Sequence, residues 1–363
     1  MYKKFSYFLL HDKGEYETYQ KHWIKSANRR PHDYPNFLEM MKPENYSSAV
    51  AIYHSENSKI IYPFYFCSLN KIPAFSSIDK PLIHIQTPYG YGGPLYEGKT
   101  EYLETASNEF EILFHQELSR QGIVSEFVRE DIFTKRLAKR TVGNCIEQQL
   151  NVVVRLELSK DEIWCNYRAK VRKNVKKAKG YNLKVLFDPA GDYLDDFIKI
   201  YHDTMTRTEA SSYFFISKEK FKNILNTLGK DGGLMLAHVL DGDLVVSTEL
   251  LLLSSDTIYS FLGGTLSSSF SKRPNDLLKH EVINWGNKKG YKWFVLGGGA
   301  TPGDGIFKYK QAFDARSIFP FTVRSIIHDQ KQYNDLIDKR LQYEQSLGRD
   351  WQPSTDFFPE YLS

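Results

Sequence analysis

The sequence predicts an α/β (α+β) fold, organised as two related α/β domains with mixed central sheets flanked by helices. Three observations support this prediction. The chain has 363 residues, more than one hydrophobic core usually serves. Its apolar content of 41% and charged content of 25% are ordinary for a globular protein. Strand-like and helix-like segments also alternate twice along the chain in a similar order.

The first half predicts strands and one long helix. Strand-like runs, helical apolar spacing and turn residues indicate strands at 47–53, 59–69, 82–86, 123–129 and 148–158, and a helix at 101–121 ended by Gly122.

The second half repeats this order. We expect helices at 159–179, 192–207, 217–228, 274–289 and 330–345, and strands at 183–187, 233–240, 244–253, 257–261, 291–296 and 317–326. Asp241-Gly242 between two apolar runs is typical of a hairpin turn. The predicted domains are 1–158 and 159–316, with 317–363 as a segment that packs back onto the first domain. A groove between two such domains is a preferred place for ligands.

The cysteine spacing, the apolar runs and the net charge indicate where in the cell the protein works. Cys67, Cys145 and Cys165 are widely spaced and form neither a disulfide framework nor a CxxC pair. No stretch approaches the roughly 20 apolar residues that span a bilayer. We expect a cytoplasmic protein without a transmembrane segment, with peripheral contact at the inner membrane surface left open. The net charge of +4 favours anionic partners but does not imply that DNA is one of them.

A glycine-rich turn is the most informative motif. Gly297, Gly298, Gly299, Gly303 and Gly305 follow the strand predicted at 291–296 and precede Phe307 and Lys308. Glycine lets backbone approach another group closely. A cation and an aromatic ring directly after the turn indicate a site for a bulky anionic ligand. The alternative is a lysine at a strand edge.

The predicted helix 159–179 is strongly basic. Ser159 to Glu162 form a capping box, and seven of the twelve residues from 168 to 179 are Lys or Arg. An apolar stripe faces the core, so the cations lie on the solvent side. The stripe consists of Trp164, Tyr167, Val171, Val175 and Ala178. We interpret Arg168, Arg172, Lys173 and Lys176 as polyanion-binding residues, with a merely solvated helix face as the alternative.

Several blocks together resemble the Fem-type (FemABX-like) peptidoglycan-bridge aminoacyltransferases of the GNAT acyltransferase superfamily. The blocks are the basic helix 168–180; 197–207; Asn275 to Glu281 with Trp285-Gly286 and Gly290; Leu296-Gly297-Gly298 with Gly305-Ile306-Phe307-Lys308; and the turn Pro88-Tyr89-Gly90-Tyr91-Gly92-Gly93-Pro94. The resemblance implies two tandem GNAT-like domains. It also implies transfer of an activated aminoacyl or acyl group to an amine of a phosphate-bearing cell-envelope precursor.

The resemblance also implies residue roles. Lys308 would meet the acceptor phosphates and stabilise the oxyanion, and the Phe307 backbone would line the acyl channel. Arg207 would pair with an acceptor phosphate or carboxylate; its alternative role is to complement a helix C-terminus. Tyr213, Tyr259 and Asn275 would contact the acceptor. The alternative for Tyr259 is a packed ring, and the alternative for Asn275 is helix initiation.

The donor stays open between aminoacyl-tRNA and acyl-CoA, and no cofactor is expected. The glycine-rich pyrophosphate loop of GNAT enzymes is missing, because the corresponding place reads Ser268 to Pro274. The long coiled-coil arm of many bridge enzymes is missing too. One alternative is an acyl-CoA-dependent N-acyltransferase acting on a nucleotide- or lipid-linked amino sugar. Another is a non-catalytic RNA-binding protein.

Other chemistries find no support in the sequence. The histidines show no HxH or HExxH spacing, so no metal site is predicted. No G-x-S-x-G elbow marks a serine nucleophile. Direct attack by a bound amine needs orientation, proton removal and oxyanion stabilisation instead.

Overall fold

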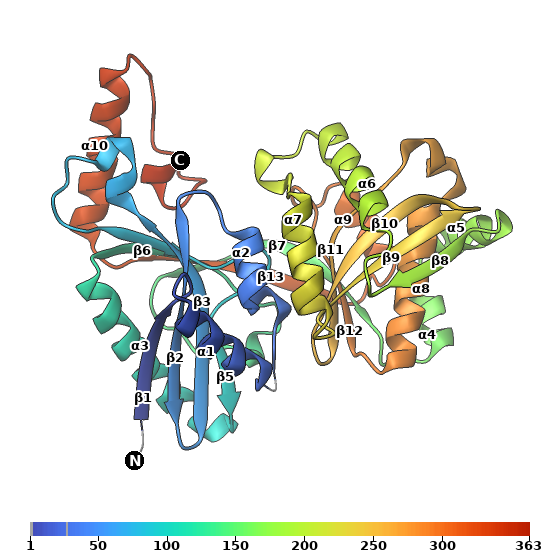
Figure 1. Cartoon of the computed structure of the whole chain (residues 1–363), viewed down its shortest axis with the longest axis horizontal. Helices are drawn as coiled ribbons and strands as arrows, with labels where there is room; N and C mark the ends of the chain where they lie inside the picture. Colours follow the sequence, from blue (N-terminus) through green and yellow to red (C-terminus); the bar gives the residue numbers. More distant parts are fainter. Residues whose placement is uncertain (1–2, 27) are drawn as a thin grey trace. The chain divides into compact units, whose positions relative to one another are not determined.

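The computed structural model describes residues 3–26 and 28–363, and the chain divides into two compact units (Figure 1). Unit 1 contains the residues up to Asn28, Met41–Gln148 and Phe321–Ser363. Unit 2 contains Arg29–Met40 and Gln149–Pro320. Whether the chain folds as independent domains with limits at 158 and 316 stays a prediction.

Unit 1 has a mixed sheet in the order β1-β2-β3-β4-β6-β13. All neighbours are antiparallel except β4 and β6, which are parallel. The strands are β1 (Lys3–Leu9), β2 (Tyr46–Ser55), β3 (Ser58–Ser68), β4 (Ile83–Gln86), β6 (Ile123–Arg129) and β13 (Ile318–Ile327), and β5 (Leu95–Gly98) also pairs with β3.

Helices α1 (Lys13–Ile24), α3 (Leu103–Arg120) and α10 (Gln330–Ser346) belong to unit 1. The apolar stripe of α3, with Phe110, Phe114 and Leu118, is buried against β2, β3 and β6. Tyr333 and Leu336 of α10 share a smaller core with Val124 of β6. The segment from Phe321 onward therefore packs within unit 1.

Unit 2 has a sheet in the order β7-β12-β11-β10-β9-β8. The β11–β12 pair is parallel and the others are antiparallel. The strands are β7 (Asn144–Arg155), β8 (Lys184–Asp188), β9 (Leu234–Asp241), β10 (Leu244–Leu253), β11 (Thr257–Thr265) and β12 (Trp293–Gly297).

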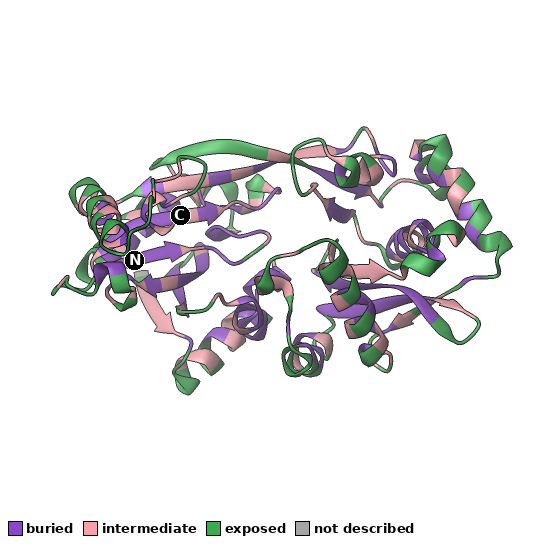
Figure 2. Ribbon diagram, turned by 90° about the horizontal axis from the view of Figure 1, so that it is seen from above, coloured by how far each residue is buried: buried purple, intermediate pink, exposed green. Residues whose placement is uncertain are grey.

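Helices cover both faces of this sheet. On one face, α4 (Lys160–Asn166), α5 (Ala169–Gly180), α8 (Pro274–Lys289) and α9 (Gly305–Gln311) enclose a core with alternate residues of the strands. On the other face, α6 (Leu194–Arg207) packs on β10 and β11, and α2 (Pro35–Met41) contacts α7 (Lys218–Ile224) through an Asn36–Asn223 hydrogen bond. Figure 2 shows buried strands between helices that are exposed on their outer sides.

The single helix predicted at 159–179 is wrong, because it is two helices. Tyr167 and Arg168 have extended backbones between α4 and α5. The Tyr167 ring is buried and its hydroxyl lies 3.2 Å from His280 Nδ1. Arg172 donates to the carbonyl oxygens of Cys165 (3.3 Å) and Tyr167, which satisfies acceptors that the end of α4 leaves free. Long-range packing therefore overrides local helix propensity here.

Candidate active site

Strands β11 and β12 diverge after a short parallel ladder. The ladder joins Thr257 to Trp293, Ile258 to Phe294 and Tyr259 to Val295. Beyond it, β11 continues to Thr265, with a bulge at Phe261, while β12 ends at Gly297. Because the strands are parallel, the segments that follow them lie at the same edge of the sheet. Ligands of open α/β sheets bind at such carboxyl ends.

The glycine-rich turn folds around the side chain of Asp304. This carboxylate accepts hydrogen bonds from the backbone N–H groups of Ala300 (2.7 Å), Thr301 (3.1 Å) and Phe307 (2.7 Å). A Cβ at Gly299 would lie 2.2 Å from Asp304 Oδ1, and one at Gly298 would lie 2.8 Å from Gln149. Gly299 is therefore required by the hydrogen-bonded Asp304 carboxylate, whereas at Gly298 the flexible end of Gln149 could move aside.

Helix α9 follows the turn and presents its residues in two directions. Phe307 is buried in the unit 2 core, whereas Lys308 is exposed. The expectation that Lys308 directly follows the turn is correct, but the residue lies in a helix and not at a strand edge. The predicted roles of Phe307 and Lys308 stay a prediction.

Lys310 is a site candidate that the sequence reasoning missed. Its Nζ donates a 2.6 Å hydrogen bond to the carbonyl oxygen of Gly298. Burial, followed by the charge of Lys279, lowers the pKa of Lys310 to about 8. One signal was available in the sequence: Lys310 lies three residues from Phe307 and three from Phe313, two buried rings, so it belongs to the inner face of the segment.

A buried ionic cluster lies beside Lys310. Lys279 of α8 pairs with Glu249 Oε1 of β10, and its Nζ lies 2.7 Å from Ser260 Oγ of β11. Ser260 also donates to Glu249 Oε1. Lys279 and Glu249 are both buried, so neither charge is solvated and each depends on the other. The sequence reasoning missed this pair as well.

The start of α8 carries a carboxylate. Arg273 precedes the helix with a φ of 63°, and Pro274 is its first residue. Asp276 is buried and accepts a 3.1 Å hydrogen bond from Asn174 Nδ2 of α5. Burial raises the pKa of Asp276, and the Asn174 hydrogen bond opposes this shift. Asn275 is half-buried at the same helix start.

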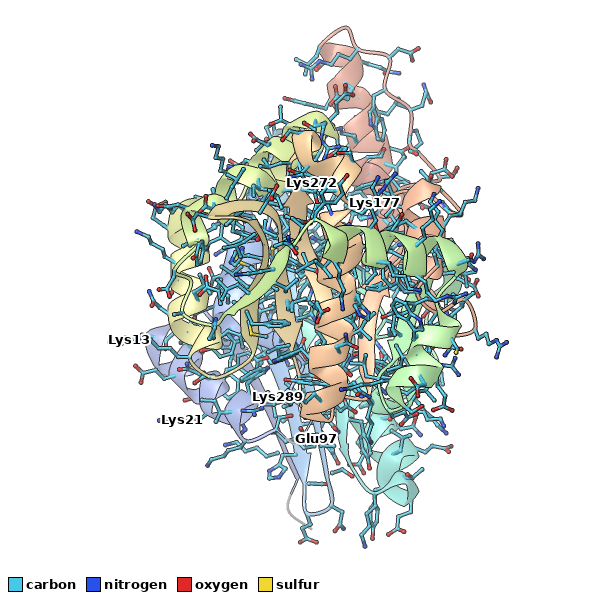
Figure 3. The ribbon with its side chains drawn as sticks, turned by 90° about the vertical axis from the view of Figure 1, so that its right-hand side faces the viewer. Lys13, Lys21, Glu97, Lys177, Lys272 and Lys289 are labelled. Atoms are coloured by element: carbon cyan, nitrogen blue, oxygen red, sulfur yellow. The ribbon has the colours of Figure 1, made fainter. Side chains whose placement is uncertain are left out.

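The basic helix α5 lies alongside α8, near α9. Arg168 donates through its backbone N–H to Ala312 O (2.8 Å) and through Nη2 to Gln311 Oε1 (3.2 Å). Arg172 is engaged by the end of α4, as described above. Lys173 and Lys176 are exposed and, among the residues described, carry no ion pair. Figure 3 labels Lys177 of α5 and Lys272, the latter close to the beginning of α8.

The remaining predicted residues lie on other parts of unit 2. Arg207, at the end of α6, is exposed with its guanidinium 5.1 Å from the ring centroid of Phe270, just beyond β11. Tyr259 is buried, with its ring 4.9 Å from that of His32, on the sheet face opposite α8. Tyr213 is half-buried in the connection between α6 and α7. The structure thus places Lys308 on α9, Arg168 against the end of α9 and Asn275 at the start of α8. Tyr259 lies on the other face of the sheet.

Across 3–26 and 28–363, no three His, Cys, Asp or Glu side chains gather as metal ligands. Over the same ranges, every helix is too short or too polar to cross a bilayer.

Comparisons with known proteins place the fold. Residues 166–311 match the family model described as an acetyltransferase (GNAT) domain. The crystal structure of FemX superposes with a TM-score of 0.65 at 13% identity, covering 92% of this chain and 99% of that one. A C-terminal domain of a putative lysylphosphatidylglycerol synthetase from Agrobacterium fabrum has a TM-score of 0.56 at 11% identity, covering 88% and 94%. No curated protein matches the sequence.

The expected architecture is therefore confirmed. The chain has a mixed α/β fold, its residues 166–311 match the GNAT domain model, and most of its length shares the fold of FemX. The resemblance to Fem-type proteins is confirmed at the level of fold.

Proposed function

We propose that this protein is an acyltransferase that forms an amide between an activated aminoacyl or acyl group and an amine of a phosphate-bearing cell-envelope precursor. The observation that carries the proposal is the position of Lys310, whose amine is held against the Gly298 carbonyl at the carboxyl end of β12. The GNAT domain model over 166–311 supports acyl transfer as the reaction class.

The chemistry requires a group that removes a proton. The neutral acceptor amine forms a C–N bond to the acyl carbonyl carbon, its nitrogen becomes positively charged and loses a proton, and the bond from that carbon to the donor's oxygen or sulfur breaks. With a pKa of about 8, Lys310 has a neutral fraction near physiological pH that can take this proton. The proton can then pass to the leaving group.

Two exposed cations of unit 2 suit the acceptor. Lys308 lies on the outer side of α9, and Arg207 lies at the end of α6 with its guanidinium over the ring of Phe270. Either would attract a phosphate without itself being buried. One neighbour of similar fold is described as a putative lysylphosphatidylglycerol synthetase, a name that refers to an amino acid attached to a phosphate-bearing lipid. This description supports a phosphate-bearing acceptor.

The start of α8 disfavours acyl-CoA bound in the usual GNAT way. Pyrophosphate binds to free backbone N–H groups at a helix N-terminus. Here Pro274 lacks an N–H group, and the Asp276 carboxylate already occupies the first turn. The exposed Lys173 and Lys176 of α5 favour an aminoacyl donor carried by a polyanion such as tRNA. No further cofactor is needed.

The test is restoration of envelope precursors in a deletion strain. Mass spectrometry should show a precursor lacking the added group, and the wild-type chain should restore that group. We expect that the Lys310→Met and Lys308→Ala chains, present at normal protein levels, do not restore the added group. The control Lys288→Met, which changes an exposed lysine near the other end of α8, should restore it. Full restoration by Lys310→Met would remove Lys310 from the reaction, and an unchanged precursor pool in the deletion strain would overturn the function.

A further inference from the structure

A cavity of about 370 Å³ lies in unit 2, at the sheet edge opposite the candidate active site. Two of its lining residues, Ser255 and Tyr291, precede the amino ends of β11 and β12, whose carboxyl ends form the candidate active site. Lys289, in the last turn of α8, also lines it and is labelled in Figure 3. Small-molecule sites usually have volumes of about 300–1,000 Å³, so the cavity suits a small ligand.

Much of the cavity wall is apolar. Leu234 and Met235 of β9 and Leu253 of β10 are buried residues of the lining. Trp285 and Tyr291 add two half-buried rings, which stack with their centroids 5.5 Å apart and their planes at 29°. Ring surfaces beside aliphatic side chains favour a ligand with a flat apolar part.

The polar side chains of the lining can all donate hydrogen bonds, and they have no partner among the residues that the structure describes. They are the Ser255 hydroxyl, the Trp285 indole N–H, the Lys289 ammonium and the Tyr291 hydroxyl. Burial raises the pKa of Tyr291, so its hydroxyl keeps its proton. None of the lining residues described is acidic. This set indicates a ligand that accepts hydrogen bonds and carries negative charge.

The carboxylates next to the lining residues in sequence are already engaged. Asp188 accepts hydrogen bonds from three backbone N–H groups. Asp231 accepts a 3.2 Å hydrogen bond from the Tyr34 hydroxyl, and Asp256 accepts a 2.8 Å hydrogen bond from the hydroxyl of the next residue. Lys289 forms no ion pair with them, so its ammonium is available to a ligand.

We propose that this cavity binds a small aromatic carboxylate, with its ring against Trp285 and Tyr291 and its carboxylate on Lys289. The site is separate from the proposed transfer reaction and does not depend on it.

A single carboxylate matches the charge of the lining. Lys289 is the one cation among the lining residues described, so it balances one negative charge. A phosphate dianion would keep an unbalanced charge beside an apolar wall, which is costly. A carboxylate also has about four lone-pair sites, so it can accept from neighbouring donors as well as from the ammonium.

The position of Lys289 has a simpler explanation that a matched residue can separate. A cation in the last turn of a helix is favoured by the helix dipole without any ligand. Lys288 is exposed in the same turn but does not line the cavity. An effect of the helix end should therefore involve both lysines, whereas a ligand contact should involve Lys289 alone.

Matched pairs of small molecules test the proposal. Calorimetry on the full chain compares 3-phenylpropanoate with 3-phenylpropanamide, and indole-3-acetate with indole-3-acetamide. We expect one or both carboxylates to bind about tenfold more tightly than the corresponding amide, as one charge-assisted hydrogen bond predicts. The ring-saturated analogue 3-cyclohexylpropanoate should bind about threefold more weakly than 3-phenylpropanoate, because it cannot stack.

Three results would overturn the proposal. They are equal binding of acid and amide in both pairs, binding of 3-cyclohexylpropanoate as tight as that of 3-phenylpropanoate, and no binding of any compound. The last result would indicate a cavity filled by water only.

Two lysine variants locate the carboxylate. Lys289→Met keeps an aliphatic stem at an exposed position and should lose the preference for acid over amide. Lys288→Met is the matched control and should keep that preference. Circular dichroism checks that both variants are folded. An unchanged preference in Lys289→Met, or an equal loss in the two variants, would contradict the assignment.

Failure of this site can be distinguished from failure of the proposed function. Lys310→Met should bind both carboxylates as the wild type does, whatever its transfer activity. Loss of carboxylate binding in a folded Lys310→Met chain would place the ligand at the other edge of the sheet and overturn the cavity site. Absence of carboxylate binding with transfer intact would remove this site and leave the acyltransferase in place.

Discussion

Asn174 of α5 donates a 3.1 Å hydrogen bond to Asp276 in the first turn of α8. Asn174 is an uncharged residue between the cations of the basic helix, and its partner is a buried carboxylate. The bond therefore joins the basic surface of α5 to the edge where α8 and α9 meet. It also favours a negative charge in the first turn of α8.

Replacing Asn174 with Ala should destabilise the protein by about 1–2 kcal/mol, because a buried carboxylate would lose its donor. The hydrogen bond lowers the pKa of Asp276 against the effect of burial, so it favours the ionised form. The decrease in the free energy of unfolding should thus be larger at pH 7 than at pH 4, where Asp276 is more protonated. Urea unfolding at both pH values measures this. The exposed neighbour Lys173→Ala serves as control, and an equal loss at both pH values would contradict the role assigned to Asn174.

Gly299→Ala should disturb α9, because the new Cβ would lie 2.2 Å from Asp304 Oδ1. Displacing this carboxylate removes the cap of the helix, worth about 1 kcal/mol. It also shifts Lys310 away from the Gly298 carbonyl. We expect lower stability and lower transfer activity.

Gly305→Ala is the matched control, because a Cβ there meets nothing within 4 Å. Alanine is also the better helix former, so the melting temperature should stay the same or rise slightly. If both variants melt alike, the close packing of the turn is not what requires glycine at 299.

Glu126 of unit 1 should make stability sensitive to acid. Its carboxylate is fully buried and forms hydrogen bonds with the Tyr62 hydroxyl (2.6 Å), the Arg140 guanidinium and His328 Nε2 (3.0 Å). Burial alone would raise the pKa of Glu126, but Arg140 and His328 hold it well below its ordinary value. The stabilisation is then present above the unfolded carboxyl pKa of about 4.3 and is lost as the pH falls below it.

Urea unfolding between pH 7 and pH 3 tests this expectation. Glu126→Gln should lose about 3 kcal/mol at pH 7, because Arg140 loses a buried partner, and the difference from wild type should shrink towards pH 3. Glu117→Gln breaks a more exposed pair with Arg120 and should change stability by less than about 1 kcal/mol. A difference for Glu126→Gln that does not depend on pH would argue against the network.

Neutralising Lys173 and Lys176 together should weaken RNA binding in a salt-dependent way. Both side chains are exposed on α5. Two lost phosphate contacts on a single strand reduce the slope of log affinity against log salt by about 1.4. Filter binding of unacylated tRNA measures the slope. A Lys13→Ala, Lys331→Ala control in unit 1 should leave it unchanged, and no difference between the two double variants would exclude α5 as the polyanion surface.

Local patterns predicted most of the elements of unit 2 but few of its inward-facing charges. The hairpin at Asp241-Gly242 and the helix Pro274–Lys289 follow from turn chemistry and helix signals that act within a few residues. The break at Tyr167 could not be predicted in this way, because its stabilising contacts come from His280 and Arg172. Only the three-dimensional packing brings these groups together.

The candidate site shows the same limit. Lys308 stands out because it follows the glycine turn, yet the less exposed lysine of α9 is Lys310. Glu249 within an apolar strand and Lys279 on a buried helix face were each visible as anomalies, since unpaired charges are rarely buried. Pairing them required knowing that α8 packs on β10 and β11.

Replacing Lys279 with Met should move the pH dependence of transfer to higher pH. Burial, and then the Lys279 ammonium, lower the pKa of Lys310, whereas Glu249 raises it. The variant removes the repelling cation and leaves Glu249 without its partner, so both changes favour protonated Lys310. Wild-type transfer should reach half its maximum near pH 8, and the midpoint of the variant's profile should lie at higher pH. Coincident profiles for the two proteins would show that Lys310 is not the group whose proton loss limits the reaction.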